Sequence, residues 1–336
     1  MKSPFVWFGG KRRVADVVWA ALGDVDNYVE PFAGSLAVLL ARPHDLDDGT
    51  RRRASTINDA DGFVANFWRS LAYDPEAVAH WADWPVNEVD LFARHLWLVN
   101  TGRSRLLNGM EADPEFYDAQ VAGWWVWGVN AWIGSGWCSG DGPWMVDDDG
   151  IIGKRPHLGD AGRGVNRQRP HLGDAGRAGY NNLETRNRIT DYFTDLASIL
   201  RDVRVCCGDW SRTVTRGALS YGGSVGIFLD PPYLGDVRTA DLYTVDDHHI
   251  ANEVRQWALD NGDNPRYRIV LAGYTTEHDH LIPDTWRRHL YSASAAYQTT
   301  ANKGGQNEAN RHLEALWFSP HCLQPEAQLD LFGGAA

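Results

Sequence analysis

The stretch Val225-Gly226-Ile227-Phe228-Leu229-Asp230-Pro231-Pro232-Tyr233 decides how this chain of 336 residues is expected to fold. Its apolar half is typical of a strand that is buried on both faces of a sheet. Two consecutive prolines cannot continue a strand ladder, so we expect the backbone to turn at Asp230, at the carboxyl end of the strand. Ligands bind at this edge of open α/β sheets. The stretch therefore predicts an α/β fold with a ligand site around Asp230.

The chemistry of this stretch suits the exocyclic amine of a nucleobase. The lone pair of such an amine is delocalised into the ring, which makes the nitrogen a poor nucleophile. Its two N–H groups could donate hydrogen bonds to the carboxylate of Asp230 and the carbonyl of Pro231, which would free the lone pair. Tyr233 could stack on the base. The structural alternative is a strand end that is capped before a surface turn.

Two stretches near the N-terminus predict the rest of this site. In the first, residues 5–13, a Gly-Gly pair allows the backbone to approach a ligand closely, with Trp7 and Lys11 on either side. A helix is expected from about residue 11 to residue 22. In the second, residues 28–40 have the pattern of a strand, a glycine turn and a helix capped by Ser35, which is the first βα unit of a nucleotide-binding sheet.

Two later strands are also expected to end at this edge. Residues 54–59 end in Asp59, and an acidic residue after the second strand typically binds ribose hydroxyls. Residues 203–210 form a strand and a turn, where Asp209 and Trp210 could flank the adenine of a cofactor.

Together these motifs resemble the Dam-type adenine methylases, in which Trp-x-Gly-Gly-Lys precedes Val-Glu-Pro-Phe-x-Gly and, much later, Asp-Pro-Pro-Tyr. The resemblance implies a doubly wound, Rossmann-like methyltransferase core that binds S-adenosyl-L-methionine and methylates the N6 amine of an adenine flipped out of double-stranded DNA. It implies that Asp230, Pro231, Pro232 and Tyr233 are catalytic. The implied cofactor-binding residues are Trp7, Gly10, Lys11, Glu30, Phe32, Gly34, Asp59 and Asp230, with Asp209 and Trp210 added from the strand pattern.

One residue departs from the family pattern. Leu36 stands where a second glycine or small residue is usual. A leucine at this position could alter how the expected helix end meets the cofactor. A non-catalytic DNA-binding relative with a decayed cofactor site therefore stays an alternative, as does methylation of cytosine N4 or of an RNA base by the same pocket.

The order of the motifs predicts four segments. The catalytic core consists of residues 1–73 and 182–320, and residues 74–181 form an inserted, helical target-recognition subdomain. Helices are expected at 74–83 and 87–99, with another starting at Asp113-Pro114-Glu115. Most of the tryptophans between 124 and 132 are expected in its core, whereas Trp137 is expected to stack on bases or sugars.

A basic internal repeat follows within the same segment. The nonapeptide Arg155–Arg163 recurs as Arg169–Arg177. Residues 154–188 contain 8 basic and 3 acidic residues, a net charge of +5, although the whole chain has a formal net charge of −12. Such a local inversion suits a surface that contacts DNA phosphates, and the alternative is a solvated basic loop. The expected contacts are Arg155, Arg163, Arg167, Arg169 and Arg177.

The composition restricts the location of the protein. Neither a signal peptide nor an apolar run long enough to span a bilayer is evident. The four cysteines show no C-x-x-C spacing, so we expect reduced thiols and no structural metal. These features favour the cytoplasm, and the resemblance implies a bacterial or phage-infected cell.

The last segment, residues 321–336, is expected to be a mobile tail. Its pentapeptide Gln328-Leu329-Asp330-Leu331-Phe332 resembles the motif by which bacterial replication and repair proteins bind the sliding clamp, which implies this clamp as a partner. Alternatively, its three apolar side chains fold back onto the core of the enzyme.

Overall fold

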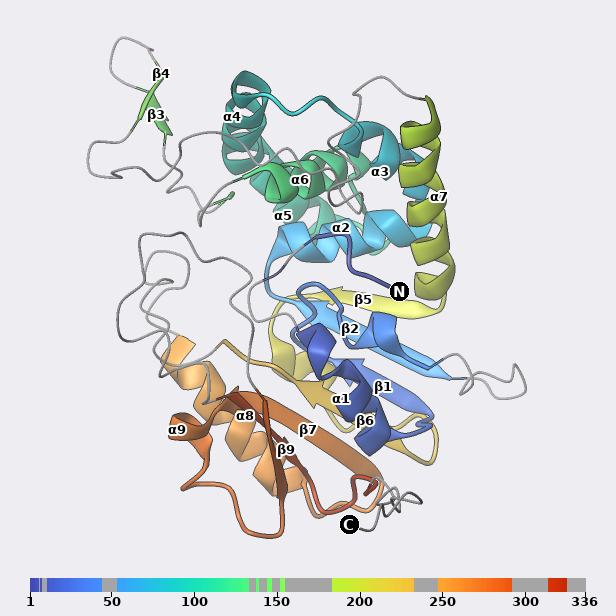
Figure 1. Cartoon of the computed structure of the whole chain (residues 1–336), viewed down its shortest axis with the longest axis vertical. Coiled ribbons are helices and arrows are strands. Elements are labelled where there is room, and N and C mark those ends of the chain that lie inside the picture. The colour runs from blue at the N-terminus through green and yellow to red at the C-terminus, as the bar shows by residue number, and fades with distance from the viewer. Residues whose placement is uncertain are drawn as a thin grey trace, which may run out of the picture.

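The computed structural model describes residues 1–5, 7, 11–43, 53–132, 137–138, 144–146, 152–154, 183–232, 247–291 and 314–324. A seven-stranded sheet lies at the centre of this part of the chain (Figure 1). In the order in which they lie side by side, its strands are β5 (Val203–Cys207), β2 (Ala54–Asp59), β1 (Asn27–Glu30), β6 (Val225–Leu229), β7 (Tyr267–Tyr274), β9 (Glu314–Phe318) and β8 (Arg287–Tyr291). Neighbours from β5 to β7 are parallel, whereas β9 is antiparallel to both β7 and β8.

Numbered along the chain, the strands of this sheet lie in the order 3-2-1-4-5-7-6. The first five follow the order of a dinucleotide-binding sheet, and the antiparallel β9 is inserted before the last strand. The sheet confirms the predicted α/β class, and its mainly parallel arrangement is compatible with a Rossmann-like methyltransferase fold. The strand order reverses between β1 and β6, so the carboxyl ends of these two strands form the switch point at which ligands bind in open sheets.

Alternate side chains of the central strands enter two separate hydrophobic cores. Tyr28 and Phe228 belong to the core on one face, together with α1 (Ala15–Leu22), α2 (Gly62–Tyr73) and α7 (Leu183–Leu200). Val29 and Ile227 belong to the core on the other face, against α8 (Asp247–Asn261). Both β1 and β6 are buried along their whole length, as expected for central strands with helices on both faces.

The remaining helices lie between α2 and α7 in the chain and gather on the same side of the sheet as those two (Figure 1). They are α3 (Pro75–Ala82), α4 (Glu88–Trp97), a turn of π-helix η4 (Leu98–Gly102), α5 (Arg103–Ala112) and α6 (Ala119–Ala131). Short elements elsewhere are the 3₁₀ turns η1 (Lys11–Arg13), η2 (Leu39–Ala41) and η6 (Trp210–Thr213), the helix α9 (Thr275–His278), and the hairpin β3 (Trp144–Val146) and β4 (Ile152–Lys154).

Side chains of Asp and Asn start four of these helices. Asp61, Asp74, Asn87 and Asp118 each accept a backbone N–H in the first turn of α2, α3, α4 and α6, respectively. Such caps satisfy amide groups that have no partner within the helix. They explain why the predicted helices at 74–83 and 87–99 are confirmed to within a few residues.

The helices between residues 74 and 131 share one core with the sheet. Val78 of α3 and Trp125 of α6 belong to the same hydrophobic cluster as Phe67 and Trp68 of α2. Trp127 and Trp132 are buried beside them, so the prediction that most of these tryptophans are core is confirmed.

Two local predictions were wrong. No α-helix follows Ser35, because Gly34 and Leu36 both adopt the left-handed conformation, with φ of 42° and 52°, and only η2 follows. Asp113 does not start a helix either. Its carboxylate accepts the amide of Glu115 and its carbonyl accepts that of Phe116, which closes a turn ahead of α6.

No helix in the described part of the chain is long and apolar enough to cross a membrane.

Candidate active site

Asp230 lies directly after β6, at the switch point of the sheet, and forms an ion pair there. Its Oδ1 is 3.0 Å from Nζ of Lys11, which η1 brings over the end of the strand. Lys11 is only 4% exposed and Asp230 is 21% exposed. Because a buried ammonium is costly without a partner, the pair holds both side chains in place. Pro231 is buried and Pro232 is half-buried, and Tyr233 lies outside the described residues.

A second carboxyl group lies at the end of the neighbouring strand. Glu30 is the last residue of β1 and is 3% exposed. Its Oε2 accepts a hydrogen bond of 2.9 Å from the hydroxyl of Tyr28. Burial, with a contribution from the nearby charge of Asp230, raises the pKa of Glu30 to about 8, and the hydrogen bonds from Tyr28 and the Leu39 amide act against this rise.

Asp59 ends β2 and reaches the glycine turn that follows β1. Its Oδ2 accepts the amide of Gly34 at 2.9 Å, and its Oδ1 accepts the amide of Asp61 at 2.9 Å. Burial raises the pKa of Asp59 to about 7, and the charge of Asp61 contributes to this rise. The structure therefore joins Asp59 and Gly34, two of the predicted cofactor residues.

Gly34 is also in close contact with Trp7. A Cβ atom at position 34 would lie 2.7 Å from the Trp7 ring, and the backbone φ of 42° disfavours any side chain. On its other side, the Gly34 carbonyl accepts the indole N–H of Trp68 at 2.9 Å. These contacts fix a turn at which only glycine fits. Gly10, the remaining predicted glycine, lies outside the described residues.

Asn58 ties together the loops at the ends of three strands. Its side-chain Nδ2 donates to the carbonyl of Pro31 at 3.0 Å and to that of Gly208 at 2.9 Å. The backbone carbonyl of Asn58 accepts the amide of Ala33. The sequence analysis missed this residue. The available signal was an amide side chain next to the acid that ends a buried strand.

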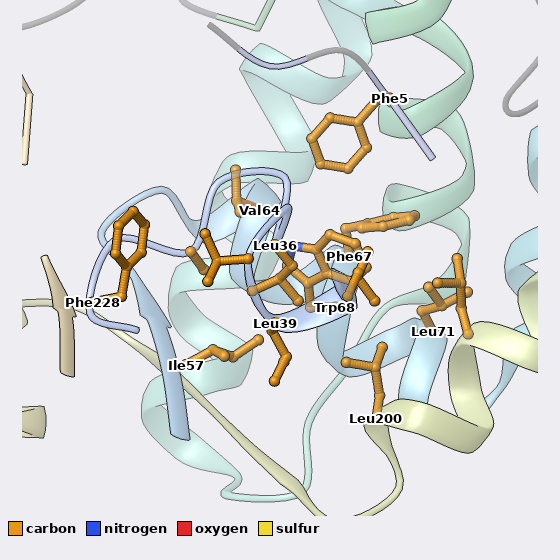
Figure 2. Close-up of a cluster of buried hydrophobic side chains, with 14 of the residues drawn as sticks. Phe5, Leu36, Leu39, Ile57, Val64, Phe67, Trp68, Leu71, Leu200 and Phe228 are labelled. Atoms are coloured by element: carbon orange, nitrogen blue, oxygen red, sulfur yellow. The ribbon is translucent and has the colours of Figure 1, made fainter. Parts of the chain in front are cut away.

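Leu36 places its side chain in the core. It is 0% exposed and lies among Leu39, Val64 and Trp68, between the sheet and α2 (Figure 2). A leucine with positive φ costs about 1–2 kcal/mol of backbone strain, which its burial offsets. The departure from the family pattern is thus accommodated by core packing.

Phe32 and Trp210 form a stacked pair after β1 and β5. Their ring centroids are 6.1 Å apart with an interplanar angle of 28°, and Trp210 also meets Trp257 of α8 edge to face. Asp209 is exposed, and its carboxylate accepts the amide of Ser211 to start η6. The structure brings Phe32 and Trp210 together beside the site and turns Asp209 toward solvent.

Trp137 does not have the surroundings expected of a residue that stacks on bases. Its indole N–H donates to the carbonyl of Trp125 at 3.1 Å, and its ring lies so close to Gly128 that no Cβ fits there. The ring also contacts Trp132. This packing gives Trp137 a structural role between α6 and the segment that follows it.

The other predicted contacts to macromolecules lie outside the described residues. These are Arg155, Arg163, Arg167, Arg169 and Arg177 of the basic repeat, and Gln328, Leu329, Asp330, Leu331 and Phe332 of the tail. Among the residues that the structure does describe, no group of three or more His, Cys, Asp or Glu side chains could hold a metal ion.

One segment of the chain matches a known family. Residues 7–84 match the family model of the D12 class N6 adenine-specific DNA methyltransferases. This segment contains Trp7, Lys11, Glu30, Gly34 and Asp59, and the match confirms the resemblance to Dam-type adenine methyltransferases. A search of curated proteins found no match.

Proposed function

We propose that the protein transfers a methyl group from S-adenosyl-L-methionine to the N6 amine of an adenine flipped out of double-stranded DNA, in the cytoplasm of a bacterial or phage-infected cell. The observation that carries this proposal is the position of Asp230. It is held by Lys11 at the switch point of the sheet, beside the segment that matches adenine methyltransferases.

The residues around the switch point fit this cofactor. Two carboxyl groups with raised pKa values, the buried Glu30 and the half-buried Asp59, suit a ligand that has cationic groups and ribose hydroxyls. Glu30 would face a cationic group, and Asp59, with the Gly34 turn, would hold the ribose. The stacked rings of Phe32 and Trp210 would line the adenine side, with Trp7, Gly10 and Asp209 completing the site.

When bound, S-adenosyl-L-methionine supplies an electrophilic methyl group on a sulfonium. The protein's part is to position the amine. Asp230 and the carbonyl of Pro231 would accept hydrogen bonds from the two N–H groups of the amine. The ion pair with Lys11 uses Oδ1 of Asp230, so Oδ2 can take this role. Pro232 shapes the turn, and Tyr233 would stack on the base. The amine loses a proton only as it gains the methyl group, so Asp230 need not be a strong base.

The assay that tests this function measures transfer of a labelled methyl group to duplex DNA, followed by digestion to nucleosides. We expect N6-methyladenine. Detection of N4-methylcytosine, or of label in RNA alone, would show that the target is cytosine or RNA and not adenine in DNA. Failure to bind S-adenosyl-L-methionine in calorimetry would indicate a non-catalytic DNA-binding protein.

We further propose that residues 74–181 recognise the DNA target and that the basic repeat contacts phosphates. Replacing Arg163 and Arg177 with alanine should weaken DNA binding and flatten its salt dependence, by roughly one unit of log–log slope for each lost phosphate contact. Cofactor affinity should not change. An unchanged salt slope would show that the repeat does not contact phosphates.

The tail motif Gln328–Phe332 is proposed to bind a bacterial sliding clamp, which would deliver the enzyme to newly replicated DNA. Replacing Leu331 and Phe332 with alanine should abolish clamp binding in a pull-down and leave methylation of short duplexes unchanged. If the variant unfolds instead, the tail belongs to the core of the enzyme.

A further inference from the structure

The switch point contains two carboxyl groups and one ammonium group. Glu30 and Asp230 follow neighbouring parallel strands, and Lys11 forms its ion pair with Asp230. No basic side chain of the described residues forms an ion pair with Glu30. Among the described residues, the ammonium group of Lys11 is therefore paired with Asp230 and not with Glu30.

Among the described residues, the groups that act directly on Glu30 are neutral or negative. On β1, the fully buried hydroxyl of Tyr28 donates to it, and from η2 the amide of Leu39 does the same. The carboxylate of Asp230 faces Glu30 from the end of β6. Burial raises the pKa of the Tyr28 hydroxyl, and the charge of Arg42 acts against this rise. A buried carboxylate with neutral donors only is costly, and burial accordingly raises the pKa of Glu30 to about 8. Without a bound cation, Glu30 thus keeps its proton at neutral pH.

We propose that Glu30 recognises the positive charge of S-adenosyl-L-methionine by releasing its proton to solvent when this cation binds. The step converts a neutral carboxyl group into the partner of a cation, and no covalent bond of the cofactor changes. The inference rests on the proposed cofactor site, and it makes Glu30 a specificity residue that favours cationic over neutral adenosine ligands.

General electrostatics set the size of the effect. An opposite charge within about 4–6 Å lowers the pKa of a carboxyl group by roughly 1–3 units. From a starting pKa of about 8, binding at pH 7 should then release roughly half to one proton. Cofactor affinity should fall by up to about tenfold for each pH unit below 7, because protons compete with the cation for Glu30.

Calorimetric titration in two buffers of equal pH and different ionisation enthalpy counts the protons that are released. The probes are S-adenosyl-L-methionine and 5′-methylthioadenosine, which has the same nucleoside and no charge. Asp59 has a pKa raised to about 7 and would respond to the ribose of either probe. The difference between the two probes therefore isolates the response to the charged methionine part of the cofactor.

The matched variants are Glu30→Gln and Asp59→Asn. In Glu30→Gln, proton release with S-adenosyl-L-methionine should fall to the level seen with 5′-methylthioadenosine. In Asp59→Asn, the difference between the probes should persist. As a variant that keeps the carboxyl group, Tyr28→Phe should move the release to higher pH, because it removes a hydrogen bond that lowers the pKa of Glu30.

Equal release with both probes, or undiminished release in a folded Glu30→Gln protein, overturns the inference while the proposed function stands. If the wild-type protein does not bind S-adenosyl-L-methionine at all, the inference and the proposed cofactor site both fail. If the melting curve shows that Glu30→Gln does not fold, the test is the pH dependence of proton release in Tyr28→Phe. An unchanged pH dependence in this variant rejects the role of Glu30.

Discussion

The two ends of strands β1 and β6 carry acidic residues in contrasting surroundings. At the amino end, Oδ2 of Asp26 accepts the amides of Gly223 and Ser224 at 2.8 and 2.9 Å and the Ser224 hydroxyl at 3.0 Å. At the carboxyl end, Glu30 is similarly buried, but the donors to its side chain are few and neutral, and its pKa is raised to about 8.

The difference separates acids that hold the fold from acids that are kept for a ligand. Asp26 closes the turn before β6 and satisfies backbone amides that would otherwise lack partners. Glu30 instead remains in a state that costs folding free energy. Such unfavourable placement is typical of functional sites, where a bound ligand supplies the missing partner.

The largest effect is expected at the carboxyl end. Replacing Asp230 with alanine should reduce methyl transfer by at least about 10²-fold, the scale for loss of a key electrostatic group, while duplex binding survives. Asp230→Asn, which keeps one acceptor oxygen, should lose less. The measurement is single-turnover transfer of labelled methyl groups.

Stability must be checked in these variants, because removing Asp230 leaves the buried Lys11 without this partner. A melting curve for each variant provides that control. Near-normal turnover in a folded Asp230→Ala protein would remove this residue from the active site.

At the amino end, the effect should fall on stability. Asp26→Ala leaves two backbone amides without their acceptor and should lower the free energy of unfolding by about 2–3 kcal/mol. Asp26→Asn, which keeps an acceptor, should lose less. Denaturant unfolding gives both values, and calorimetry should show unchanged cofactor affinity. A change in affinity with unchanged stability would contradict the contrast between the two ends.

A smaller effect is expected at the neighbouring pair of Asp24 and Arg53. Two hydrogen bonds of 2.8 and 3.0 Å join these side chains, but Asp24 is 33% exposed. Because exposed ion pairs contribute little, Asp24→Ala should cost about 1 kcal/mol or less, measured as above and decreasing with added salt. A loss as large as that of Asp26→Ala would mean that the amino end is held mainly by charge.

Much of this arrangement could be predicted from the sequence. The apolar run before Asp230 and the strand ending at Glu30 are confirmed as neighbouring buried strands. Their carboxyl ends meet because parallel strands share one direction, so a local pattern was enough to place both acids at one edge. The helix expected from about residue 11 to residue 22 is confirmed as η1 and α1.

Other features depend on contacts between distant segments. The ion pair of Lys11 with Asp230 joins residues more than 200 positions apart, and no local pattern reports it. The apolar run after Ser35 has helical spacing, yet the turn is fixed by Asp59 and Trp7 against Gly34, which overrides that spacing. The edge strand β8 was missed because it has alternate side chains only half-buried and contains charged residues.

The sharpest test of the contrast is the pH dependence of Glu30→Gln, whose effect on stability should be smallest at low pH. The pKa of Glu30 rises from 4.5 to about 8 on folding, so between these values the folded protein binds more protons than the unfolded chain. The stability associated with this carboxyl group is therefore fully present below about pH 4.5 and is lost as the pH rises through 8. Near pH 4, where this carboxyl group is mostly protonated in both states, the neutral glutamine should change the free energy of unfolding by less than about 1 kcal/mol. Above pH 4.5 the variant should become progressively more stable than the wild type, by up to about 1.4 kcal/mol for each pH unit until about pH 8, because only the wild type has a carboxyl group that loses its proton on unfolding. Denaturant unfolding at pH 4 and pH 9 measures the difference, with Asp26→Asn as the matched control at the opposite end of the strands. If Glu30→Gln is strongly destabilised at both pH values, Glu30 is a structural residue like Asp26, and the distinction between the two ends of the sheet is lost.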